Sequence, residues 1–122
     1  MPVRWGFRGP VLTLSVSGVV TNPEIELAMK DALANAPSQG GIRLLWDARE
    51  TLTPMTTDDL RWRFKLVSAL AQRGALTRAC VLFRSEQQQI VALVRPQFAL
   101  AIPGVPCEAF TDASEAAAWL EG

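Results

Sequence analysis

Hydrophobic residues alternate with Ser and Thr at positions 12–17, in the stretch LTLSVS. This two-residue period predicts a β-strand with one buried face. The preceding stretch RWGFR is also suited to a strand, and the Gly9-Pro10 pair between the two stretches is typical of a turn. We therefore expect the chain to begin with a β-hairpin.

Two later stretches are hydrophobic with little alternation, namely IRLLWD at residues 42–47 and ACVLF at residues 79–83. Continuous runs of this kind are typical of parallel strands that are covered on both faces. A shorter stretch, VPCEAFT, predicts one more strand near the end of the chain. The sequence thus predicts five strands.

Between and after these strands lie four segments with helical periodicity. The first is TNPEIELAMKDALANAP, and the second covers residues 58–73. The third is SEQQQIVALVRPQFALAI, with Pro96 as a kink or a stop, and the fourth is TDASEAAAWLEG. Candidate N-caps of the first, third and fourth helices are Asn22, Ser85, and Thr111 or Asp112.

The order of elements predicts the α/β class. It reads ββαβαβαβα, and helices that alternate with strands favour a small mixed, mostly parallel five-stranded sheet with flanking helices. The chain contains no internal repeat and no low-complexity tract. We expect residues 1–122 to form one domain.

The charge balance narrows the possible partners. Lys and Arg together number 12, as do Asp and Glu, so the net charge is zero. A neutral chain has no general attraction for nucleic acid or anionic lipid, and we expect neither as a partner. No apolar stretch reaches the roughly 20 residues needed to span a membrane, and the N-terminus lacks a signal-peptide pattern. We expect a soluble, cytoplasmic protein.

The residues available for chemistry are few. The chain has no His, which is the commonest general base and transition-metal ligand at neutral pH. Cys80 and Cys107 lie in apolar stretches without the spacing of a zinc site, so we interpret them as core residues. Asp47 is expected to pair with Arg49 or Arg43. We predict no metal, no cofactor and no enzymatic activity.

Several stretches together resemble a known family. They are LSVSGVVT before the first helix, an apolar strand that ends in Asp47, and the closing FTDASEAAAWL. The succession resembles the SpoIIAA-like (STAS) proteins, and most closely their stand-alone bacterial branch, which is related to anti-anti-sigma factors. The resemblance implies a small mixed sheet flanked by helices.

In signalling members of that family, a partner kinase phosphorylates a serine at the start of the helix after the Asp-terminated strand. The matching positions here are Thr56 and Thr57, and MTTDD stands where the family has DSSG. A helix start needs side-chain oxygens as acceptors, and Asp58 and Asp59 favour the positive helix end but would repel a phosphate. A helix cap is therefore the preferred interpretation, and phosphorylation of Thr56 or Thr57 is the alternative.

The second predicted helix has a hydrophobic arc that is wider than one contact with a sheet requires. Trp62 and Leu66 extend this arc beyond the positions that suit the sheet. One interpretation places them at the margin of the core. The other makes them, with Asp58 and Asp59, a docking surface for a protein partner or for a second copy in a homodimer.

The third predicted helix is hydrophobic around much of its circumference. We expect Ile90, Leu93 and Val94 to face the sheet, whereas Val91, Phe98 and Ile102 point elsewhere. With Phe64 of the second helix, Val91 and Phe98 would enclose a cleft for a small apolar molecule. A distant likeness between this family and lipid-carrying domains favours that hypothesis, and simple core packing is the alternative.

The sequence thus predicts a non-catalytic STAS-like regulatory module that acts through protein–protein association. The alternative function is a carrier or sensor of a small, lipid-like apolar ligand held between helices.

Overall fold

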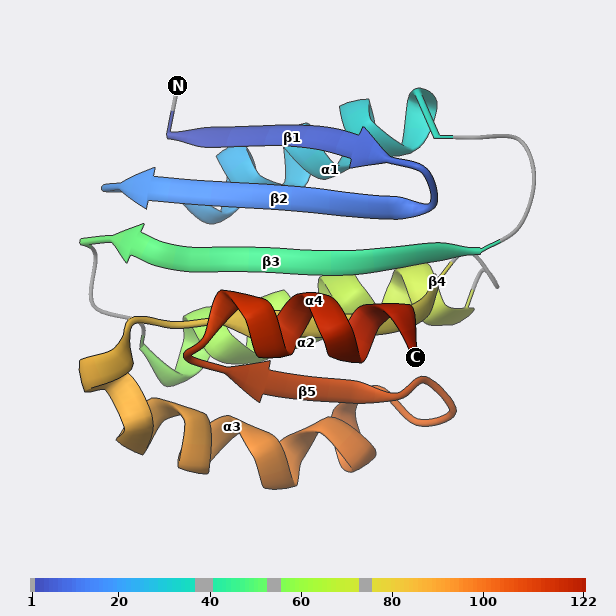
Figure 1. Ribbon diagram of the computed structural model, residues 1–122. Coiled ribbons are helices and arrows are strands. Elements are labelled where there is room, and N and C mark those ends of the chain that lie inside the picture. Colours follow the sequence, from blue (N-terminus) through green and yellow to red (C-terminus); the bar gives the residue numbers. More distant parts are fainter. Residues whose placement is uncertain (1, 37–40, 53–55, 73–75) are drawn as a thin grey trace.

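A computed structural model describes residues 2–36, 41–52, 56–72 and 76–122 (Figure 1). The predicted order ββαβαβαβα is confirmed, with one short 3₁₀ turn, Ser85–Gln87, before the third helix. The elements are β1 (Val3–Arg8), β2 (Val11–Gly18), α1 (Asn22–Ala34), β3 (Ile42–Thr51), α2 (Thr57–Gln72), β4 (Leu76–Leu82), α3 (Gln88–Ala101), β5 (Cys107–Phe110) and α4 (Ala113–Glu121).

The described strands form one five-stranded sheet in the order β1-β2-β3-β4-β5. β1 and β2 are antiparallel, and the other pairs are parallel, as predicted. The hairpin turns at Gly9, whose φ of 59° is readily adopted only without a side chain. Gly9 is followed by Pro10, so the predicted turn is confirmed.

The sequential strand order decides where the helices lie. Parallel strands are joined by right-handed crossovers, and when each new strand is added on the same side, all crossover helices fall on one face of the sheet. α1, α2 and α3 are such crossovers, and their buried residues share one hydrophobic core. α4 follows the last strand and packs on the opposite face, in front of the sheet in Figure 1.

Strand register builds the floor of the main core. Leu14 of β2 lies beside Trp46 of β3, and Trp46 lies beside Val81 of β4. Because side chains alternate along each strand, these positions share a face. A smaller cluster, containing Cys80 and Leu120, lies under α4 on the other face.

The helix caps differ in part from the sequence prediction. α1 is capped by Thr21, one residue before the predicted Asn22, because Thr21 and Glu24 form a reciprocal capping box. Asp112 caps α4, accepting from the N–H of Glu115 at 3.0 Å. Ser85 does not cap α3, since it lies within the separate 3₁₀ turn.

The orientation of α3 corrects a prediction. Val91 and Ile102 were expected to point away from the sheet, yet both are buried in the main core together with Val94. Leu93, expected to face the sheet, is 59% exposed. The side of α3 that faces the core carries Val91 and Val94 and continues through the half-buried Phe98 to Ile102. Arg95 and Gln97 lie on the other side of the helix, outside the core. Pro96 lies inside α3 on its exposed side and does not end the helix.

No helix in the described ranges combines the length and the hydrophobicity that crossing a membrane would require.

Candidate functional site

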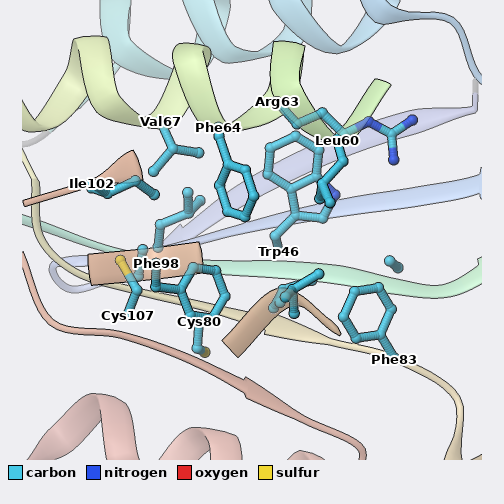
Figure 2. Close-up of a pocket in the computed structure, with 15 residues that line it drawn as sticks. Trp46, Leu60, Arg63, Phe64, Val67, Cys80, Phe83, Phe98, Ile102 and Cys107 are labelled. Carbon is cyan, nitrogen blue, oxygen red and sulfur yellow. The ribbon is translucent and has the colours of Figure 1, made fainter. Parts of the chain in front are cut away.

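An apolar cavity of about 80 Å³ lies between α2, α3 and the sheet (Figure 2). We call it the inner cavity. Its floor includes Trp46 of β3 and Val81 of β4, which are neighbours in the strand register. Its roof includes Phe64 and Val67 of α2 and residues of α3. Small side chains on the strands, such as Ala79, leave the space open beneath the helices.

Phe64 and Phe98 meet across the two helices. Their ring centroids are 5.7 Å apart and the ring planes are perpendicular, which is the edge-to-face contact that aromatic rings favour. Both rings line the inner cavity. The structure therefore brings these two predicted ligand residues together. Val91, the third predicted ligand residue, is buried elsewhere in the core and is not part of the cavity lining.

Arg63 lies towards one end of the inner cavity, beside Trp46 and Leu60 (Figure 2). Its guanidinium carbon is 6.0 Å from the Trp46 ring centroid, at the limit of a cation–π contact. Burial lowers the pKa of Arg63, and the nearby carboxylate of Asp59 opposes this shift. An arginine remains charged at neutral pH in either case. The cavity is thus apolar along its length with one cationic residue at its end.

Of the two cysteines, Cys107 turns its thiol towards the main core and the inner cavity, whereas the Cys80 side chain lies on the opposite face, under α4. Burial raises the pKa of Cys80 to about 12, and burial raises the pKa of Cys107 to about 11. Both groups are therefore protonated at pH 7, and the thiolate is the form that attacks electrophiles or binds metals. In the parts of the chain that the structure describes, no cluster of three Cys, Asp or Glu side chains is arranged to hold a metal ion.

A shallow groove of about 460 Å³ lies on the outer surface between α2 and α3. We call it the outer groove. Arg61, Lys65 and Leu100 line it, together with the outer side of Phe64. Leu100 is 87% exposed. The outer groove therefore combines two cations with apolar surface.

Sequence reasoning missed Trp46 and the two cations of the outer groove. Trp46 was interpreted only as part of an apolar strand. However, a large Trp46 and a small Ala48 on the same face of a strand already indicate that the side chains there differ greatly in volume. Arg61 and Lys65 are exposed on the polar side of α2, and a polar side of a helix by itself indicates only contact with solvent. The two residues are four positions apart and therefore lie one helical turn apart. They line a groove only because α3 lies beside this side of α2.

At the start of α2, Thr56 forms a reciprocal cap with Asp59. The Thr56 hydroxyl accepts from the N–H of Asp59 at 3.1 Å, and the Asp59 carboxylate accepts from the N–H of Thr56 at 3.2 Å. The Asn22 amide also donates to Asp59 at 3.2 Å, which ties the start of α1 to the start of α2. These bonds, led by that from the Thr56 backbone, lower the pKa of Asp59. The cap interpretation is confirmed for Thr56.

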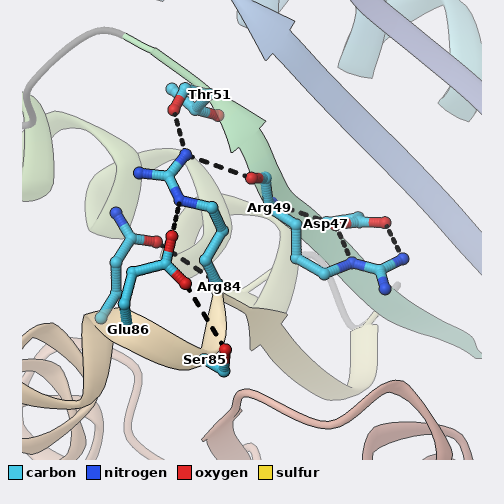
Figure 3. A network of polar contacts seen from close by, with 7 residues as sticks. Asp47, Arg49, Thr51, Arg84, Ser85 and Glu86 are labelled. Carbon is cyan, nitrogen blue, oxygen red and sulfur yellow. Dashed lines mark hydrogen bonds and ion pairs between the residues drawn. The ribbon is translucent and has the colours of Figure 1, made fainter.

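Arg49 and Asp47 form an ion pair in the second half of β3 (Figure 3). Arg49 Nη2 lies 2.8 Å from Asp47 Oδ2, one of the two predicted pairings. Burial alone would raise the pKa of Asp47, but the hydrogen bonds from Arg49 outweigh it and lower that pKa. Arg84 donates to the carbonyls of Arg49 and Thr51 and so fastens β4 to the end of β3. These residues brace the strand ends.

Comparison with known proteins places the fold in a family. The sequence model of the SpoIIAA-like family matches residues 11–121. The chain belongs to the SpoIIAA-like family.

One solved structure with a similar arrangement is an uncharacterized DUF3478-family protein with a SpoIIAA-like fold from Shewanella loihica PV-4. It shares 18% sequence identity with this chain, the alignment covers 97% of this chain and 91% of that one, and the TM-score is 0.58. At this identity the likeness concerns the SpoIIAA-like fold. Among curated proteins, no match is found.

In this SpoIIAA-like chain, the two threonines predicted as possible phosphorylation positions differ in their surroundings. The Thr56 hydroxyl is engaged in the cap, whereas Thr57 is the first residue of α2 and is exposed. A phosphate on Thr56 would displace the cap and lie against the Asp59 carboxylate. Phosphorylation of Thr57, or of Thr56, stays a prediction.

The predicted docking residues of α2 are divided between core and surface. Trp62 and Leu66 are half-buried and pack against the main core, so each leaves only part of its surface to a partner. Asp58 is exposed, with Arg61 Nη1 at 3.9 Å, and Asp59 is held by the cap. The partner-binding role of these residues of the SpoIIAA-like domain stays a prediction.

Proposed function

We propose that this SpoIIAA-like domain is a non-catalytic binding module and that a small apolar ligand occupies its inner cavity. The observation that carries the proposal is the apolar cavity of about 80 Å³ between α2, α3 and the sheet, which is partly open to solvent. At roughly 24 cal/mol for each Å³ of an empty closed cavity, a void of this size costs at most about 2 kcal/mol of folding free energy. An apolar ligand that fills the void recovers part of the lost contacts.

The chemistry of the lining supports binding rather than turnover. Catalysis requires an activated nucleophile or a tuned acid–base pair. Apart from Arg63 and the indole of Trp46, the lining side chains are hydrocarbons and the protonated thiol of Cys107. These side chains favour the binding of apolar molecules and provide no proton acceptor at neutral pH.

The size of the inner cavity indicates which ligands fit. An apolar cavity of about 150 Å³ holds benzene. A space of about 80 Å³ is better suited to a short alkyl chain than to an aromatic ring. We therefore expect the occupant to insert a few methylene groups between Phe64, Phe98 and the strands.

Methyl NMR with 1-hexanol as the probe tests the proposal. We expect saturable shifts of the methyl groups of Val67, Val94 and Ile102, which line the inner cavity. The methyls of Ile25 and Val16, buried under α1, serve as the internal control and should not shift. Absence of saturable shifts at all three cavity residues would overturn the proposal. Native mass spectrometry of the purified protein would add the identity of any retained ligand.

Protein–protein association, with a second copy or another protein, is the second candidate. It is favoured by Leu93 and Leu100, which are 59% and 87% exposed and lie two turns apart on α3. Trp62 and Leu66 were the residues predicted for this role. Light scattering over a range of concentrations tests self-association, with Leu93→Glu and Trp62→Asp as variants of the two helices. A constant monomer mass for the wild-type protein would exclude the homodimer.

A further inference from the structure

Phe64 separates the inner cavity from the outer groove. It is shared by the linings of both spaces, on the core side with Phe98 and on the outer side with Lys65 and Leu100. The Phe64 ring is half-buried, and its only ring contact among the described residues is the edge-to-face contact with Phe98. A rotation of this ring towards the outer groove would join the two spaces.

The outer groove has the charge of an anion site. Arg61 and Lys65 lie one turn apart on α2, and no carboxylate is among the described residues that line the groove. Asp58 approaches Arg61 only at 3.9 Å, and an exposed pair at that distance contributes little. Ser68 and Gln97, also part of the lining, add hydrogen-bonding groups.

We propose that the ligand is an anionic amphiphile, of the alkyl carboxylate class, and that Phe64 is the gate through which its tail enters. The carboxylate lies against Arg61 and Lys65 in the outer groove, and the alkyl tail passes the Phe64 ring into the inner cavity. Leu100 covers the part of the chain that crosses the groove. This inference rests on the proposed function, because the tail uses the same inner cavity.

Comparing hexanoate with 1-hexanol separates the head-group site from the cavity. We expect the wild-type protein to bind hexanoate about tenfold more tightly than 1-hexanol, since two exposed cations each contribute modestly. The double variant Arg61→Gln/Lys65→Gln should bind both probes equally. Lys30→Gln, which removes an exposed lysine of α1, is the matched control and should keep the preference.

The outcomes distinguish the two proposals. If the wild-type protein binds both probes equally, or if the double variant keeps the preference for hexanoate, the anion site is refuted while the apolar cavity stands. If neither probe produces saturable shifts at the cavity methyls, the proposed function fails and this inference fails with it.

The gate is tested by the rate of association. Phe64→Ala should speed hexanoate association about tenfold, because binding would no longer wait for the ring to move. Phe64→Leu, which keeps more of the packing, should give a smaller acceleration and guards against loss of folding in the first variant. Phe7→Ala, a half-buried Phe of β1, is the control. An unchanged association rate in folded Phe64 variants would refute the gate.

Discussion

The face of the sheet that carries α1, α2 and α3 has two unlike halves. Under α1, the side chains of Leu14 and Ile25 are completely buried, and Met29 beside them is nearly so. Under α2 and α3, the same face contains the inner cavity, and two of the rings that line it, Phe64 and Phe98, are only half-buried. We call these the packed half and the hollow half.

The two halves differ in the strands beneath the helices. α1 lies over the antiparallel hairpin of β1 and β2, whereas α2 and α3 lie over the parallel strands β3 to β5, although the residues of both halves belong to one hydrophobic core. Where α1 and α2 meet, a void lined by Leu12 and Leu70 measures only about 10 Å³, close to a single water-sized space. The chain therefore packs closely where α1 covers the sheet and leaves room beneath α2 and α3, where we place the ligand.

Truncation of an Ile in each half should give the largest effect. Ile25→Ala, in the packed half, is expected to lower the free energy of unfolding by about 4 kcal/mol, because close neighbours cannot fill the space. Ile102→Ala, in the lining of the inner cavity, should cost only about 2 kcal/mol, since its side chain already lacks contacts on one side. Urea denaturation measures both values. Equal losses would contradict the division into two halves.

Adding one methylene to each half should have opposite effects. Val16→Leu, in the packed half, is expected to lower stability by about 2 kcal/mol through overpacking. Val67→Leu, above the inner cavity, is expected to raise it by about 0.8 kcal/mol, the value of one buried methylene. Thermal unfolding gives both signs. A loss of stability in Val67→Leu would show that the cavity cannot accept added hydrocarbon.

The cap of α2 stands at the junction of the two halves, because Asp59 receives hydrogen bonds from both helices. Thr56→Ala should lower the free energy of unfolding by about 1 kcal/mol. Thr57→Ala, at the next position, should change it by less than about 0.5 kcal/mol, since its side chain is exposed and does not form the cap. The same denaturation experiment compares the two variants. The reverse order would assign the cap to Thr57.

Acid should weaken the same junction slightly. The pKa of Asp59 and the pKa of Asp47 are lowered in the folded protein from an ordinary value of 3.8. Each carboxylate therefore adds stability above about pH 4, and this contribution is lost as the pH falls through the folded pKa. We expect well under about 1 kcal/mol for Asp59, because the site is solvated. Asp59→Asn should flatten the decline between pH 5 and pH 3, and a slope identical to wild type would contradict this assignment.

The sequence predicts the backbone architecture well and the cavity poorly. The alternation in β2 and the continuous hydrophobic runs of β3 and β4 predict the sheet. Residue periodicity identifies the strands, and the right-handedness of crossovers leaves few possible topologies. The predicted orientation of the third helix segment was wrong at Val91, Leu93 and Ile102, because a segment that is hydrophobic around most of its circumference does not indicate which side faces the sheet. Phe64 and Phe98 were identified as neighbours from their helices.

The inner cavity itself has no periodic signature. Its volume depends on how Ala79 and Trp46 sit beneath the rings of α2 and α3, which is a matter of side-chain shape in three dimensions. The outer groove likewise arises only when the polar side of α2 meets α3. An apolar ligand site between these helices could be proposed from the sequence, whereas the position of Arg61 and Lys65 in a groove beside it could not.

The agreement between chain order and strand order has a consequence for biogenesis. Each strand pairs with the one synthesised just before it, so no strand must later be inserted between two others. The elements β1 to β3 with α1 leave the ribosome first and contain the closely packed layer, which can serve as a template for the remainder. Short sequence separations between partners favour rapid folding. The inner cavity is therefore enclosed after the packed half, and α4 covers the opposite face of the sheet last.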